Sequence, residues 1–301
     1  MRLVHLTDPH LTSLSGQSFI GLAGKRWTGY LSWRRKRRFV HRPEVLEQLT
    51  RAVRDEAAQQ IVLTGDLAHI GLPQEIAQAV GWLESLGSPA QVRLVPGNHD
   101  VYARDSWPAV AQLWADYIGL TGAAADAAAG DPAAPYPVLR EIECDGGRVR
   151  IVGLSSACRT PLFMASGRLG AGQLARFEAM LDAANAFTCV LIHHPPLPGM
   201  ESWRKGLHDA AALARLLDRH PPMLVLHGHG HHNVTATTPG GSVVLGTASA
   251  SSASAAAPAC YRVLDVTRNG DGWHIDMCLK QVGGEGPPQV IDQRSWRLPA
   301  A

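Results

Sequence analysis

The chain has 301 residues, of which 46% are hydrophobic and 18% are charged, and its formal net charge is +2. A chain of this length and composition can bury a large core, and no Ser-rich or charge-rich linker divides it, so we expect a single domain over residues 1–301. The sequence has no run of about 18 apolar residues, which excludes a membrane-spanning helix.

Short runs rich in Val, Ile and Leu alternate with segments that have apolar residues at helical spacing. The short runs are typical of strands that are buried on both faces. In chain order the predicted elements are strand Leu3–Leu6, helix Glu44–Gln60, strand Ile61–Leu63, helix Pro73–Leu86, strand Val92–Val95, helices Ser106–Tyr117 and Gly172–Ala183, strand Val190–Ile192, helix Asp209–Arg219, and strands Met223–Leu226, Val243–Leu245, Tyr261–Val266 and Trp273–Leu279. Residues 269–272 form a predicted turn, and the low-complexity stretches 123–135 and 248–257 are expected to be loops.

Five of the predicted strands end in residues that commonly bind metal ions. The motifs are Asp8-Pro9-His10, Gly65-Asp66, Gly97-Asn98-His99-Asp100, His193-His194 and Gly228-His229-Gly230-His231. In layered α/β folds, ligands bind outside the carboxyl ends of the strands, so these residues can converge in space. Their oxygen and nitrogen donors, without cysteine, favour manganese, iron or zinc over a soft-metal site. The set is too large for one tetrahedral ion.

The order and spacing of these motifs resemble the calcineurin-like metallophosphoesterase family, whose pattern is D-x-H, G-D, G-N-H-D, H and G-H-x-H. The resemblance extends from Arg2 to about Ala250 and is closest to the bacterial branch of phosphodiesterases and UDP-diacylglucosamine hydrolases. It implies an α/β fold in which two packed sheets are flanked by helices, an αββα sandwich. It also implies two metal sites. The first comprises Asp8, His10, Asp66 and His231, and the second comprises Asp66, Asn98, His193 and His229.

This resemblance implies a metal-dependent phosphoric ester hydrolase. The two oxygens of Asp66 can bridge ions about 3.5–4 Å apart, a separation at which one solvent molecule can also bridge them. The bridging hydroxide would then attack phosphorus while the metals offset the developing charge. His99, beside the predicted ligand Asn98, is the candidate for protonating the leaving oxygen. We expect two divalent ions, with manganese as the favoured metal and iron or zinc as alternatives.

The sequence does not fix the roles of two further histidines, His69 and His194. His69 occupies a position where the better-known phosphatases of the family have a second acid, three residues after the Gly-Asp motif. It either contacts substrate phosphate, sits beside His99 or caps the following loop. His194 is a candidate substrate contact, because the family's ligand is the first residue after the apolar run and is therefore His193. A scaffold protein that binds partners through an old metal site is the non-enzyme alternative, but every ligand position is filled here.

Positive charge is concentrated between the first two motifs. Residues 25–42 contain eight Lys or Arg residues and no acid, which leaves the remainder of the chain at 2 − 8 = −6. Aromatic residues such as Trp27, Trp33 and Phe39 are interleaved with these charges. We refer to residues 25–42 as the basic segment, which is the main part of an insert predicted over about 16–42. It is expected to form a helix or lid at the mouth of the site.

The class of substrate that we expect depends on what the basic segment binds. It could lie on an anionic membrane surface, bind nucleic-acid phosphates, or simply be a solvated charge run. Membrane contact would favour a lipid-linked substrate such as UDP-diacylglucosamine, as in lipid A synthesis. The alternative is a soluble cyclic nucleotide or a glycerophosphodiester. The oligomeric state is left open.

The five cysteines are an odd number without paired spacing, which indicates a reducing compartment. Asp8 and His10 interrupt the first apolar run and belong to the predicted metal site, so a cleaved targeting peptide would remove ligands. We therefore expect a cytoplasmic protein that could associate peripherally with the inner face of the membrane.

Overall fold

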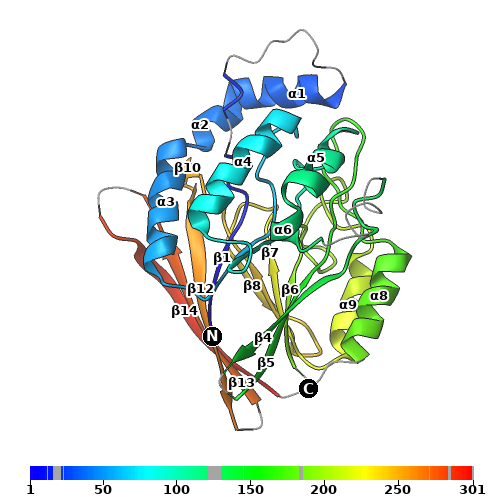
Figure 1. The fold of residues 1–301 in the computed structure, drawn as a ribbon, viewed down its shortest axis with the longest axis vertical. Coiled ribbons are helices and arrows are strands. Elements are labelled where there is room, and N and C mark those ends of the chain that lie inside the picture. The colour runs from blue at the N-terminus through cyan, green and yellow to red at the C-terminus, as the bar shows by residue number, and fades with distance from the viewer. Residues whose placement is uncertain are drawn as a thin grey trace.

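Two six-stranded sheets pack against each other in the computed structural model, and helices cover their outer faces (Figure 1). The structure describes residues 1–11, 13–15, 22, 24–120, 130–144, 146–182, 186–270, 272–283 and 286–299. This arrangement confirms the predicted α/β fold with two packed sheets.

The first sheet has the strand order β14-β13-β12-β1-β2-β3. Its strands are β1 (Arg2–Leu6), β2 (Gln60–Leu63), β3 (Val92–Leu94), β12 (Cys260–Asn269), β13 (Gly272–Gln281) and β14 (Gln289–Pro299). β1, β2 and β3 are parallel, whereas β12, β13 and β14 add an antiparallel meander beside β1. The carboxyl ends of the three parallel strands therefore meet at one edge of the sheet.

The second sheet has the order β4-β5-β6-β7-β9-β8. Its strands are β4 (Val138–Cys144), β5 (Gly147–Gly153), β6 (Phe187–Leu191), β7 (Leu224–His227), β8 (Val234–Thr237) and β9 (Val243–Gly246). β5, β6, β7 and β9 are parallel, and β4 and β8 close the two edges in antiparallel pairing. A short hairpin, β10 (Ala253–Ser254) and β11 (Ala257–Pro258), stands outside both sheets.

The helices connect the strands and fall into two groups in Figure 1. One group, on the side of the first sheet, comprises α3 (Pro43–Asp55), α4 (Pro73–Leu86), α5 (Ser106–Leu113) and α6 (Ala115–Ile118). The other, α8 (Ala171–Asp182) and α9 (Ala210–Arg219), packs on the second sheet. The basic segment forms α1 (Lys25–Ser32), the π-helix η1 (Trp33–Arg37) and α2 (Arg38–Val40), which confirms that it is helical.

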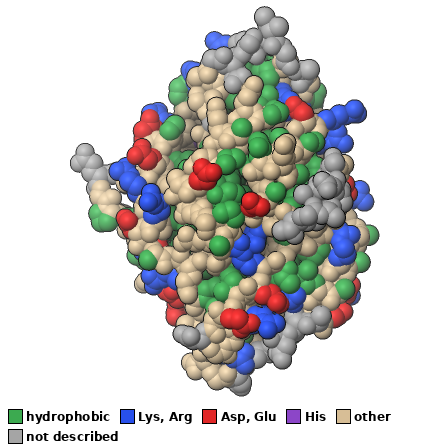
Figure 2. All heavy atoms as spheres, viewed as in Figure 1, with side chains coloured by type: hydrophobic (Ala, Val, Ile, Leu, Met, Phe, Trp, Pro, Cys, Tyr) green, Lys and Arg blue, Asp and Glu red, His purple; other side chains and the backbone are tan. Residues whose placement is uncertain are grey.

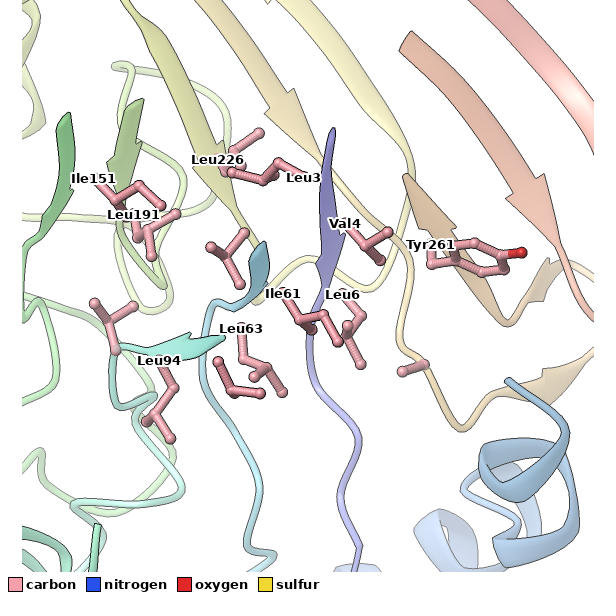
Figure 3. Close-up of a cluster of buried hydrophobic side chains, with 14 of the residues drawn as sticks. Leu3, Val4, Leu6, Ile61, Leu63, Leu94, Ile151, Leu191, Leu226 and Tyr261 are labelled. Atoms are coloured by element: carbon pink, nitrogen blue, oxygen red, sulfur yellow. The ribbon is translucent and has the colours of Figure 1, made fainter. Parts of the chain in front are cut away.

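The core lies mainly between the two sheets, where side chains from both gather (Figure 3). Leu3 and Leu63 of the first sheet and Leu191 and Leu226 of the second are completely buried. Each such side chain stabilises the fold by about 1.5–3 kcal/mol relative to an exposed one. This burial fixes the two sheets relative to each other, and with them the loops at the strand ends.

Several predicted boundaries differ from the structure. The helix predicted over Glu44–Gln60 ends at Asp55, because Ala57 adopts a positive φ of 50° that a helix does not allow. The helix predicted over Ser106–Tyr117 is divided into α5 and α6 at Trp114, whose ψ of 10° departs from helical geometry.

The sequence patterns missed the strands β4, β5, β8 and β14. β14 is a mostly exposed edge strand, so it lacks the apolar run that marks a buried strand. The stretch 248–257, predicted to be a loop, includes β10 and the start of β11. The other predicted loop, 123–135, falls partly on residues 121–129, which lie outside the described residues; residues 130–135 form turns and irregular structure.

All five cysteines are free thiols. Among the described residues, no helix is both long and apolar enough to span a bilayer. Basic and acidic side chains are interspersed over the face shown in Figure 2, in keeping with the nearly balanced net charge.

Candidate metal centre

All seven predicted metal ligands lie in loops that follow parallel strands. Three strands of the first sheet and two of the second lead into these loops. Asp8 and His10 follow β1, Asp66 follows β2, Asn98 follows β3, His193 follows β6, and His229 and His231 follow β7. The centre therefore lies where the carboxyl edges of the two sheets meet.

The backbone is strained at these loops. Seven non-glycine residues among those described have positive φ, and five of the seven are predicted ligands. Their φ angles are 50° at Asp8, 41° at His10, 57° at Asp66, 67° at His229 and 55° at His231. Such conformations are unfavourable for residues with a Cβ atom and tend to cluster at functional sites.

Glycines in the motifs allow the loops to approach each other. A Cβ atom on Gly97 would collide with the Asp66 carboxylate, and one on Gly228 would collide with Thr7 and with the Asp8 carboxylate. Any larger residue would push the strand-end loops apart. These glycines are therefore required by close packing between the loops.

The first cluster contains Asp8, His10 and Asp66, whose ligand atoms lie within 4.8 Å of one another. His231 joins it, with Nε2 3.1 Å from Oδ1 of Asp8. Nδ1 of His10 donates to the carbonyl of Ala68 at 3.0 Å, so its Nε2 carries a lone pair. That buried Nε2 has no hydrogen-bond partner among the described residues. A bound cation would satisfy it.

The second cluster is centred on His193. Its Nδ1 donates to the carbonyl of Thr64 at 2.6 Å, which leaves Nε2 as the nitrogen that faces the other candidate ligands. Nε2 lies 3.1 Å from Oδ1 of Asn98, 3.4 Å from Oδ2 of Asp66 and 3.2 Å from Nδ1 of His229. Nε2 of His193 and its three neighbours are thus four potential ligand atoms that lie close together. This arrangement fits ligands of one ion better than hydrogen bonding among themselves.

The charges of the centre also fit cations. Asp8 and Asp66 are buried, and within the described ranges their ion pairs are with histidines and not with Lys or Arg. Burial favours the neutral form of His193, but Asp66 and Asp8 more than offset this and raise its pKa to about 9. For Asp8, burial is likewise outweighed by His231 and His193, which hold its pKa below the usual value. Two carboxylates here require positive charge, which divalent ions would supply.

His99 contacts both the centre and the basic segment. Its backbone N–H donates to Oδ1 of Asp66 at 2.7 Å, and its Nδ1 donates to the carbonyl of His69. Its Nε2 accepts a hydrogen bond from Nη1 of Arg37 at 2.8 Å. Burial and the Arg37 guanidinium keep the pKa of His99 well below its usual value. Both effects favour the neutral form of the ring.

Asp100, the last residue of the Gly-Asn-His-Asp motif, positions the loops. Its carboxylate accepts hydrogen bonds from four backbone N–H groups, those of Asp66, Leu67, Ala68 and Gly97, at 2.8–2.9 Å. Burial and the nearby charge of Asp66 raise its pKa to about 7. Asp100 thus links the loop after β3 to the loop that carries Asp66.

The two histidines with open roles are held by the protein. His69 stacks on His10 with ring centroids 5.1 Å apart, and its carbonyl fixes the His99 ring. Nδ1 of His194 lies 2.8 Å from Oγ of Ser156, and Nε2 lies 3.1 Å from the carbonyl of Ala165. Both nitrogens of His194 therefore have protein partners, and one of them also lies within 4.8 Å of ligand atoms of His193 and His229.

Sequence reasoning missed His41 as a residue of the centre. It is buried, its ring lies 4.3 Å from that of His10, and it forms a third potential metal group with His10 and His231. Nδ1 of His41 hydrogen-bonds Oγ of Ser251 at 2.8 Å. His41 follows the basic segment's helices and belongs to no ligand motif, so its sequence position alone gave no signal.

A cavity of about 460 Å³ opens over the centre. Asp66, Asn98 and His99 line its floor together with His229 and His231, and the basic segment contributes Ser32, Lys36, Arg37, Val40 and His41. The basic segment is thus a wall of this cavity, as predicted for a lid at the mouth of the site. His69 and His194 do not line it.

Comparison with known proteins agrees with this geometry. The family model described as calcineurin-like phosphoesterase matches residues 1–233. A cAMP/cGMP dual specificity phosphodiesterase of Mycobacterium tuberculosis is 29% identical over 206 residues, covering 64% of this chain and 54% of the relative. A glycerophosphodiester phosphodiesterase of Enterobacter lignolyticus is 28% identical over 188 residues, covering 60% and 59%. The matched region thus spans somewhat more than half the length of these curated relatives.

Among solved structures, a dimetal phosphatase from Danio rerio aligns over 100% of this chain and 99% of its own, with a TM-score of 0.62 and 14% identity. Purple acid phosphatase from yellow lupin aligns over 98% of this chain and 53% of its own, with a TM-score of 0.51 and 13% identity. At such low identity these similarities show a shared fold.

Proposed function

Because the chain belongs to the calcineurin-like phosphoesterase family, we propose that it is a metal-dependent phosphoric ester hydrolase that acts on phosphodiesters. The observation that carries this proposal is the position of Asp66, whose carboxylate belongs to the first ligand cluster and lies 3.4 Å from His193 of the second. One carboxylate shared by two clusters is the arrangement that a two-metal hydrolase requires.

In this proposal Asp8, His10, Asp66 and His231 hold the first ion, and Asp66, Asn98, His193 and His229 hold the second. When bound, two divalent ions would activate a solvent nucleophile and offset charge on the phosphoryl oxygens. The mixed carboxylate, amide and imidazole donors favour manganese, with iron or zinc as alternatives.

His99 is the proposed proton donor to the leaving oxygen. The carbonyl of His69 fixes Nδ1 as the protonated nitrogen, so Nε2 is the atom that faces Arg37 and the cavity. Donation requires a proton on Nε2, whereas in the free protein this atom accepts from Arg37. The proposed role therefore needs Arg37 to turn from His99 when an anionic substrate binds.

The test is a substrate panel with metal analysis. Protein loaded with Mn²⁺ is offered bis(p-nitrophenyl) phosphate, p-nitrophenyl phosphate, cyclic AMP and glycerophosphocholine, and kcat/KM is compared. We expect two equivalents of metal and a preference for diesters. A protein that binds two ions but prefers the monoester would contradict the diesterase proposal, and one that binds no metal would contradict the whole assignment.

A lipid-linked pyrophosphate such as UDP-diacylglucosamine is the second candidate substrate. It is favoured by the exposed residues of the basic segment, which include Arg34, Arg35 and Arg38 as well as Trp27 and Phe39, whose exposed fractions are 46% and 57%. Aromatic and basic side chains together favour an anionic membrane interface. Peripheral membrane association is part of this second proposal, and nucleic acid is the competing polyanion.

A further inference from the structure

The basic segment is fixed to the rest of the molecule at its first half. Tyr30 and Trp33 are buried in a small apolar cluster with Ile70, Leu72 and Tyr102. Arg26 adds hydrogen bonds to the backbone carbonyls at 70 and 71, at 3.1 Å and 2.6 Å. These contacts join the segment to the loop that follows Asp66.

The other end of the segment is fixed next to the metal centre. Nδ1 of His41 hydrogen-bonds Oγ of Ser251, and the N–H of Arg42 donates to the carbonyl of Ser251 at 2.9 Å. The N–H of His41 donates to the carbonyl of Arg37 at 2.8 Å. With both ends attached, the side chains between them have defined directions.

Arg37 points inwards, unlike its neighbours. Residues 34–38 are five consecutive basic residues, and all except Arg37 are exposed. Arg37 ends the π-helix η1, whose wider turn departs from α-helical spacing, a feature frequent at functional sites. Its guanidinium reaches the cavity wall, where Nη1 lies 2.8 Å from Nε2 of His99.

This guanidinium has unused hydrogen-bonding capacity. An arginine side chain has five N–H donors, but within the described part of the chain the side-chain hydrogen bonds of Arg37 come from Nη1 and go only to His99. No carboxylate of the described residues forms an ion pair with it. A half-buried cation without an acidic partner is costly, unless a ligand supplies the missing negative charge.

We propose that Arg37 is a substrate-binding residue whose guanidinium binds the non-bridging oxygens of the phosphoryl group held over the metal centre. This inference rests on the proposed function. A planar guanidinium can bind phosphate oxygens in pairs, which fixes the orientation of the phosphoryl group as well as its charge. The basic segment thereby becomes part of the active site and not only a cover for it.

The experiment measures binding of inorganic phosphate to the Mn²⁺-loaded protein by isothermal titration calorimetry. Arg37→Ala and Arg37→Gln should weaken phosphate binding roughly 10- to 100-fold, the loss expected for charge-assisted hydrogen bonds. Arg37→Lys should recover part of the loss, because it keeps the charge but not the paired geometry. Arg35→Ala removes the same side chain from the exposed face and should bind phosphate like the wild type.

Metal content and unfolding midpoint are measured for each variant, so that a folding defect is separated from a binding defect. If Arg37→Gln keeps its metal and its stability and binds phosphate as tightly as Arg35→Ala, the proposal is overturned. It is also overturned if the wild type binds no phosphate at millimolar concentration. Because no turnover is involved, the result is independent of whether the protein hydrolyses diesters.

Discussion

At the scale of single residues, the metal-ligand motifs could be identified from the sequence because each follows a buried strand. The apolar run marks the strand, and the sheet topology brings the strand ends together. The sequence alone did not predict the roles of Arg37, His41 and Asp100. Arg37 is one of five consecutive basic residues. Only the geometry of the helix determines that its side chain, and not that of a neighbour, points inwards. His41 depends on a contact with Ser251, 210 residues away.

His99→Ala should leave metal content unchanged and lower turnover of an alkyl phosphodiester roughly 10²–10⁴-fold, the range expected for loss of a general acid. The loss should shrink for bis(p-nitrophenyl) phosphate, because nitrophenolate leaves without a proton. Steady-state kinetics on both substrates provide the measurement. Equal losses on the two would show that His99 acts in another way, for example by holding Arg37 or Asp66.

Asp100→Asn should destabilise the fold although Asp100 is not a predicted ligand. The carboxylate accepts four backbone hydrogen bonds, whereas an amide offers one oxygen and places an N–H₂ group against the remaining donors. We expect a loss of about 2–4 kcal/mol in the free energy of unfolding, measured with urea. Asp116→Asn, at an exposed position, is the control and should change little. Comparable curves for both variants would contradict the positioning role.

At the scale of elements, helices and strands with a buried face could be predicted, while exposed or irregular ones could not. α4 was predicted with the bounds it has in the structure, Pro73–Leu86. The edge strand β14 was missed because Leu298 is the only buried residue in it. The basic segment was predicted to be a helix or lid, but its composition could not show that Trp33 faces the protein while Phe39 faces outwards.

Reversal of charge on the outer face of the basic segment should separate the function of that face from the function of the inward-pointing Arg37. Arg34, Arg35 and Arg38 changed together to Glu alter the local charge by six units (three sites, two units each), without touching Arg37. If the segment binds membranes, co-sedimentation with anionic vesicles should be lost while hydrolysis of a small diester changes little. Wild-type binding should also weaken in high salt, because surface charges are screened within about 8–10 Å.

Neutral vesicles and a single-stranded oligonucleotide are the comparison ligands for that variant. A wild type that ignores anionic vesicles at low salt would remove the membrane proposal and leave the small diester as substrate. Binding to the oligonucleotide but not to vesicles would favour nucleic acid instead.

At the scale of the whole molecule, the predicted ligands come from both sheets. Asp8, Asp66 and Asn98 belong to the first sheet's loops, and His193 and His229 to the second's. The sequence implied this through the family resemblance, but the strand order, with β12 beside β1 and β9 beside β7, emerges only from tertiary pairing. Bound ions would therefore add a further connection between two halves of the fold that are held together by apolar packing and by hydrogen bonds, such as those from Arg262 of β12 to the carbonyls of Val234 and Gly246.

Metal removal should for this reason lower the stability of the whole molecule and not only its activity. A ligand that binds only the folded state stabilises it by about 4 kcal/mol per site at 1,000 times its Kd. Mn²⁺ added to chelator-treated protein should raise the unfolding midpoint by several degrees in differential scanning calorimetry. In Asp66→Ala both sites lose their shared ligand, so most of this increase should disappear. Glu143→Ala, at an exposed position of β4, should respond like the wild type. A wild-type midpoint that does not move with Mn²⁺, or an Asp66→Ala midpoint that rises equally, would contradict a metal centre that joins the sheets through Asp66.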